Sequence, residues 1–108
     1  VKERLALMHL FYTCGSSQSC IKNNWGSTPL VTPAWYGVTL SASGHVTHLD
    51  LAQCHLQGNL PQTIALLEHL QRLDLDKNPK LKSLPREFAR LANLSYLKLP
   101  ANIQLPNS

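Results

Sequence analysis

Histidines and cysteines are the residues of this 108-residue chain that could bind a metal or react covalently. The three cysteines allow at most one internal disulfide, and Cys14 and Cys20 either close a small loop together or remain free thiols. His45 and His48 lie three residues apart at the start of an expected strand, which points their side chains to opposite faces. We therefore expect no metal site at this pair, and no other metal site in the sequence.

Sequence patterns typical of catalysis are missing. The chain contains no nucleophile elbow, no H-E-x-x-H, no phosphate-binding glycine loop and no paired-cysteine zinc spacing. Asp50 and Asp74 could suggest acid–base chemistry, but nothing in the sequence predicts a pocket that would desolvate them. We expect a non-catalytic protein with no catalytic residues and no cofactor.

Composition sets the size and class of the fold. With 44% hydrophobic and 15% charged residues, the chain suffices for one compact domain. No apolar run approaches the roughly 20 residues of a membrane-spanning helix, so we expect no direct membrane insertion. The net charge of +4 includes a basic series with one aromatic residue, Phe88, at an expected core position. A solvated convex face is therefore favoured over nucleic-acid binding. The series is Lys77, Lys80, Lys82, Arg86 and Arg90, diluted by Glu87.

The second half of the chain repeats with a period of 24 residues, the length of one coil of a solenoid. Apolar residues recur at each period, and a Cys or Asn follows them. The aligned sets are Val46, Leu70 and Leu94; Leu49, Leu73 and Leu97; Leu51, Leu75 and Leu99; and Cys54, Asn78 and Asn102.

The stretch VTHLDLAQCHLQGNLPQTIALLEHL resembles the leucine-rich repeat L-x-x-L-x-L-x-x-N/C-x-L, and LQGNLP resembles its plant-type L-x-G-x-L-P variant. The resemblance implies an α/β solenoid, a short right-handed coil with parallel strands on its concave face. It also implies that Cys54, at the turn position, is structural rather than reactive.

The first 45 residues resemble the N-terminal cap of the same family. ERLALMHLFY suits a helix that packs on the first coil, and Gly15 would end this helix. Its apolar residues at helical spacing are Leu5, Met8 and Tyr12, and Leu7, Leu10 and Phe11. AWYGVTLSASGHVTHLDL predicts a loop, a strand, a turn over 41–44 and the first repeat strand. We expect one structural domain, with a helix-plus-hairpin cap over 1–45 and repeats over 46–108 that make two full coils and a truncated third.

The compartment is left open by the sequence, with secretion slightly favoured. Many secreted caps of the resembled type bracket W-x-G-V with two cysteines, whereas this chain has Pro33 and Leu40 there. Asn93-Leu94-Ser95 matches the glycosylation acceptor pattern, but N-L also precedes each strand in this family.

The repeat register places the non-leucine strand residues side by side on the concave face. Asp50 beside Asp74 is a like-charge pair. Its repulsion would be relieved by Arg72, Lys98 or His48, or by a cationic group on a partner. Two interpretations stay open: a solvated, self-compensating face, and a surface that binds a protein partner. The candidate residues are His48, Asp50, Arg72, Asp74, Asp76, Tyr96 and Lys98.

The family resemblance implies non-catalytic protein–protein recognition through the concave face. One alternative is a homodimer formed through the uncapped last coil, because an unfinished coil leaves its leucines facing water. Another is the leading fragment of a longer leucine-rich-repeat receptor or effector, suggested by the start at Val1 and the truncated third coil. The residues of the candidate self-association edge are Tyr96, Leu97, Leu99 and Leu105.

Overall fold

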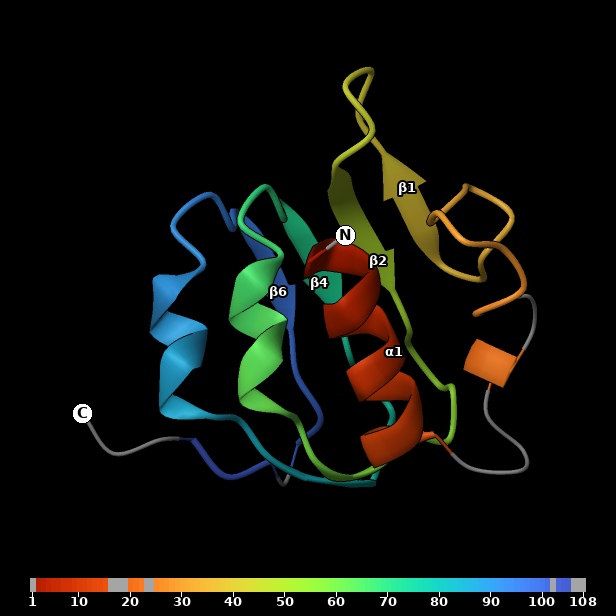
Figure 1. Cartoon of the computed structure of the whole chain (residues 1–108). Coiled ribbons are helices and arrows are strands. Elements are labelled where there is room, and N and C mark those ends of the chain that lie inside the picture. Colours follow the sequence, from red (N-terminus) through yellow and green to blue (C-terminus); the bar gives the residue numbers. More distant parts are fainter. Residues whose placement is uncertain (1, 16–19, 23–24, 102, 106–108) are drawn as a thin grey trace.

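The computed structural model describes residues 2–15, 20–22, 25–101 and 103–105. Its centre is a four-stranded sheet of order β1-β2-β4-β6 (Figure 1). β1 and β2 form an antiparallel hairpin, and β2, β4 and β6 run parallel to one another. The strands are β1 Val38–Leu40, β2 Val46–Asp50, β4 Arg72–Asp74 and β6 Tyr96–Lys98.

The parallel strands follow the predicted period. Leu49 of β2 pairs in register with Leu73 of β4, which pairs with Leu97 of β6. Side chains alternate between the two faces of a strand, so the leucines of each L-x-L point to one side. Leu49 and Leu73 are fully buried in a single core shared with the N-terminal segment. The predicted repeat register and parallel strands are confirmed.

Helices cover the inner face of the sheet. Figure 1 shows α1 beside two short 3-10 helices, η2 and η3, in a row on one side of the sheet. Each 3-10 helix follows a Leu-Pro pair, and Ile64 and Phe88 pack from them toward the core. Among the described residues, no helix is long and apolar enough to cross a membrane. The bounds are α1 Lys2–Cys14, η1 Cys20–Lys22, η2 Gln62–Leu66 and η3 Arg86–Arg90.

A second, two-stranded parallel sheet pairs β3 (Gln57–Asn59) with β5 (Lys80–Ser83), and Gln104 bridges to Ser83 at its edge. β3 coincides with the Q-G-N of LQGNLP. Gly58 has φ +80°, and a Cβ there would lie 3.4 Å from the Thr13 carbonyl oxygen. Glycine is therefore favoured at this position by the left-handed backbone rather than by lack of space.

The cap buries a narrower stripe of α1 than the apolar pattern suggests. Leu7, Leu10 and Cys14 are fully buried, but Leu5 is 58% and Tyr12 is 78% exposed. The expectation that Leu5 and Tyr12 pack on the first coil is wrong, because the helix turns only one side toward the core. α1 ends before Gly15, as predicted.

Two tryptophans hold the loop that precedes β1. Trp35 is fully buried and donates Nε1–H to Thr28 Oγ1 at 3.0 Å, and Trp25 donates Nε1–H to the Tyr36 carbonyl at 2.9 Å. The predicted turn over 41–44 joins β1 to β2, and β2 begins at Val46.

The disulfide joins Cys20 to Cys54 across 34 residues of sequence. Both open alternatives for the cap cysteines, a Cys14–Cys20 bond and free thiols at both positions, are therefore wrong. Cys14 alone is free, and burial raises the pKa of its thiol to about 12. Cys54 is structural, as expected, and its role is a covalent bond to Cys20 in the N-terminal segment.

Asn78 occupies in the second coil the position that Cys54 holds in the first. Its side chain is fully buried. Its Oδ1 accepts the N–H groups of Cys54 and Leu56 at 3.0 and 3.1 Å. Its Nδ2 donates to the carbonyls of Leu51, Leu75 and Asp76 at 2.8 to 3.1 Å. One amide thus joins the turns of two coils. The next predicted member of this row, Asn102, lies outside the described residues.

Candidate binding surface on the concave sheet

The concave face, on the side of the four-stranded sheet opposite the core, brings together the predicted binding residues. His48, Arg72 and Tyr96 are paired across the parallel strands, and so are Asp50, Asp74 and Lys98. Asp76 follows β4 in the turn after the strand. Their adjacency follows from the strand register, since paired residues of neighbouring strands share a face.

Arg72 organises this face. Its Nε donates to Asp50 Oδ1 at 2.6 Å, and its Nη2 lies 3.9 Å from Asp74 Oδ2. Its guanidinium carbon lies 3.9 Å from the centre of the Tyr96 ring. The hydrogen bond with Asp50 raises the pKa of Arg72 above its ordinary value, so the guanidinium stays charged. The like-charge pair Asp50 and Asp74 therefore has a counter-ion within the chain.

The remaining charged side chains of the face differ in whether they have partners within the chain. Asp74 Oδ1 accepts the N–H of Asp76 at 3.1 Å, and Asp76 Oδ1 accepts the N–H of Lys77 at 2.9 Å, so both carboxylates also shape the turn. Lys98 is exposed and makes no ion pair with any residue that the structure describes. Lys98 is therefore a cation available to a partner.

A hollow of about 500 Å³ adjoins the face at the ends of the parallel strands. Three of the residues that line the hollow have a left-handed backbone conformation. They are Gln53, His55 and Lys77, with φ of 53°, 57° and 58°. Our sequence reasoning did not propose these residues for the site. The period could have found two of them, because Gln53 and Lys77 are 24 residues apart at the same turn position. The hollow extends the candidate site beyond the strands.

The last coil is less covered than the coils before it. Leu97 is 40% exposed, whereas Leu49 and Leu73, its equivalents in the earlier coils, are fully buried. Leu105 is 61% exposed and Leu99 is half-buried. This edge carries the residues expected for self-association, and Tyr96 belongs to both surfaces.

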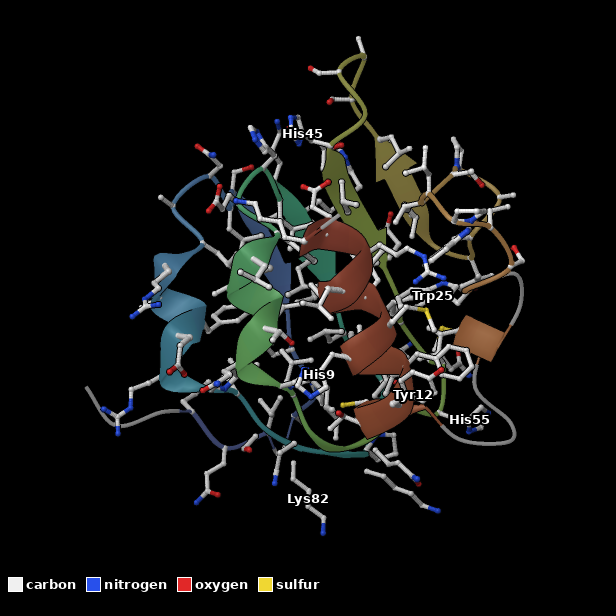
Figure 2. All side chains as sticks on the ribbon, in the orientation of Figure 1. His9, Tyr12, Trp25, His45, His55 and Lys82 are labelled. Atoms are coloured by element: carbon white, nitrogen blue, oxygen red, sulfur yellow. A yellow bond between two sulfur atoms is a disulfide. The ribbon has the colours of Figure 1, made fainter. Side chains whose placement is uncertain are left out.

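The basic series is spread over a turn and two elements. Lys77 lies in the turn after β4, Lys80 and Lys82 lie on β5, and Arg86 and Arg90 lie on η3, all exposed. Figure 2 shows Lys82 directed away from the body of the protein at the edge formed by the second sheet. Phe88 is half-buried against the core, as the register predicts.

Stacked coils, each contributing a strand to one parallel sheet and a short helix to the other side, define a solenoid. The family model described as leucine rich repeat matches residues 44–102, which is more than half of the chain. The protein belongs to the leucine-rich-repeat family. A comparison with curated proteins gave no match.

Solved structures share the fold at low sequence identity. A plant ice-binding protein is 22% identical over 94% of this chain and 33% of its own, with a TM-score of 0.77. The Arabidopsis receptor kinase HAESA in complex with the peptide hormone IDA and the co-receptor SERK1 gives 21% identity, 96% and 22% coverage, and a TM-score of 0.62. The BIR3–SERK2 complex from Arabidopsis thaliana is 19% identical over 95% of this chain and 70% of its own, with a TM-score of 0.56. This chain thus spans a third or less of the length of the ice-binding protein and of HAESA.

Proposed function

We propose that this chain is a non-catalytic recognition domain that binds a protein partner through its concave face. The observation that carries the proposal is the arrangement around Arg72, which holds Asp50, Asp74 and Tyr96 in one network before any partner binds. A surface ordered in advance loses less conformational entropy on binding. Aromatic and arginine side chains are also the residue types that most often dominate binding energy.

The partner that fits this face carries charges of both signs. Lys98 calls for an acidic group, while the partly exposed Asp50 and Asp76 favour a cationic group near the hollow. The cation is not needed to relieve the Asp50–Asp74 pair, because Arg72 does so. It would serve specificity, since opposite charges across an interface exclude wrong partners.

Structural neighbours support a role in recognition. HAESA was solved bound to a peptide hormone and a co-receptor, and BIR3 was solved with SERK2. For this chain we infer only that a sheet of this kind can bind a protein.

Reversing the charge of Lys98 is the first test. We expect Lys98→Glu to recover a partner from a native extract at a level roughly tenfold or more below wild type, because the new carboxylate repels the partner's acid. Quantitative mass spectrometry of the captured proteins measures this. Lys82→Glu is the matched control, because it makes the same charge change at an exposed position of the second sheet. A partner lost equally with both variants, or with neither, contradicts recognition by the concave face.

An oxidising compartment is supported by the disulfide. Cys20–Cys54 bonds the cap to the first coil, and disulfides persist mainly in secreted and extracellular proteins. We infer that the domain works outside the cytosol.

The second candidate function is self-association through the last coil, favoured by the 40% exposure of Leu97. Sedimentation analysis should then show a dimer whose fraction rises with concentration. Leu97→Asp should make the protein monomeric, because it would place a charge in an apolar contact. Tyr12→Asp, at an exposed residue of the cap helix, should leave the dimer unchanged. Wild type that stays monomeric at all concentrations contradicts this candidate.

A further inference from the structure

The acceptor pattern Asn93-Leu94-Ser95 lies in the turn that joins η3 to β6. It is the one place in the sequence where Asn is followed, after one residue other than Pro, by Ser or Thr. Figure 1 shows this turn at the end of the sheet where the parallel strands begin. Asn93 and Ser95 are exposed, while Leu94 between them packs against the core. The two residues that define the pattern are therefore accessible from solvent.

The repeat fold does not itself require this combination of residues. The 24-residue register aligns Asn93 with His45 and His69, so two of the three coils fill the position with another residue. It aligns the exposed Ser95 with Thr47, which is buried in the first coil. Of the three coils, the third alone combines an asparagine with an exposed hydroxyl two residues later. A purely structural role of the repeat position does not account for that combination.

The hydrogen bonds of the turn are compatible with attachment of a sugar. Asn93 Nδ2 donates to the Glu68 carbonyl at 3.0 Å, and this bond uses one of its two hydrogens. The second hydrogen can therefore be replaced while the bond to Glu68 is kept. The backbone of the turn is held independently of these side chains, because the Ser95 N–H donates to the Gln71 carbonyl at 2.9 Å.

We propose that Asn93 is a site of N-linked glycosylation. The co-reactant is an oligosaccharide carried on a lipid pyrophosphate. The bond between the first sugar's C1 and Asn93 Nδ2 forms, the bond between C1 and the pyrophosphate oxygen breaks, and Nδ2 loses one proton. This site rests on the compartment proposed above, since the transfer takes place in the secretory pathway, where disulfides such as Cys20–Cys54 also form.

The glycan would occupy the end of the sheet that lies away from the hollow beside the concave face. Asn93 lies where the parallel strands begin, whereas the hollow lies where they end. Figure 2 shows these two ends apart, with His45 at the first and His55, which lines the hollow, at the second. A bulky polar glycan at Asn93 would exclude partners from its own end and is compatible with a partner bound at the hollow.

The test is expression of the whole chain behind a cleavable secretion signal in mammalian cells, followed by mass spectrometry of the protein. Trypsin cuts after Arg90 and Lys98, so residues 91–98 form one peptide whose only asparagine is Asn93. We expect most of this peptide to carry a glycan. Peptide N-glycosidase should release the glycan and convert residue 93 to aspartate. Protein retained in the cells is analysed in the same way.

Two substitutions of Ser95 make the test specific. Ser95→Ala should abolish the glycan, because it removes the hydroxyl of the acceptor pattern and leaves Asn93 in place. Ser95→Thr is the matched control, since it changes the same exposed residue, keeps a hydroxyl and should be glycosylated like the wild type. Both variants should fold, because the bond to the Gln71 carbonyl comes from the backbone N–H, and circular dichroism checks this.

Either of two outcomes would overturn the glycosylation site. One is a folded wild-type protein whose peptide 91–98 has its unmodified mass. The other is a glycan that Ser95→Ala retains, which would place the sugar on a different residue. Failure of the proposed compartment is measured separately, as free thiols at Cys20 and Cys54. Failure of recognition by the concave face is measured by partner capture, and neither of these two readouts involves the peptide 91–98.

Discussion

Replacing Asn78 with alanine is expected to lower the free energy of unfolding by roughly 3–5 kcal/mol, a large part of the stability of a small domain. The amide is fully buried and lies within hydrogen-bonding distance of five backbone groups of two coils, three of which share its two N–H donors. Alanine would leave several of those groups buried and unpaired, and each such group costs about 1–3 kcal/mol. Urea unfolding followed by circular dichroism measures the change.

Asn93→Ala is the matched control for this substitution. Asn93 is exposed and makes one described side-chain hydrogen bond, to the Glu68 carbonyl. Its loss should cost about 1 kcal/mol or less. The interpretation of Asn78 as the link between the coils fails if the two variants are destabilised equally.

Loss of the Cys20–Cys54 disulfide is the second large effect. The double variant Cys20→Ser/Cys54→Ser should lose about 3–4 kcal/mol, because a bond that closes 34 residues restricts the unfolded chain by about that much. Reduction of the wild-type protein with dithiothreitol should shift the urea midpoint in the same direction. The two measurements together separate the bond from the effect of the serines.

Cys14 provides the control within the same protein. Because burial raises its pKa from 9.0 to about 12, the folded Cys14 carries roughly 1,000-fold less thiolate near neutral pH than an exposed thiol would. A thiol reagent should therefore label native protein very slowly, and one cysteine per chain should react after unfolding in urea without reductant. Rapid labelling of Cys20 or Cys54 in the native protein would contradict the observed disulfide.

Much of the sheet could be predicted because the relevant order is local and periodic. Once Leu49, Leu73 and Leu97 are aligned at a constant spacing, the residues beside them must form rows across parallel strands. The positions of Asp50, Asp74 and Lys98 in one row follow from this geometry without any knowledge of side-chain conformation. The concave face was predictable as a set of residues for that reason.

The chemistry within those rows was less predictable. The long side chain of Arg72 can adopt several rotamers. Only one of them lets it bond Asp50, stack on Tyr96 and neutralise the acidic pair. The exposed Leu5 and Tyr12 likewise depend on which side of α1 faces the first coil. A hydrophobic pattern with apolar residues on more than one side of a helix leaves that choice open.

By itself, the sequence determined the leucine-rich period, the parallel strands and the order of residues on the concave face, because a repeat converts spacing along the chain directly into neighbours in space. Only the tertiary structure decided that Cys20 bonds Cys54 and that Cys14 stays buried and free. Those outcomes depend on where a non-repeating cap loop meets the first coil, and no periodicity governs such a contact. Sequence therefore predicts the repeated part of the chain, whereas the contacts of the unrepeated part depend on the tertiary structure.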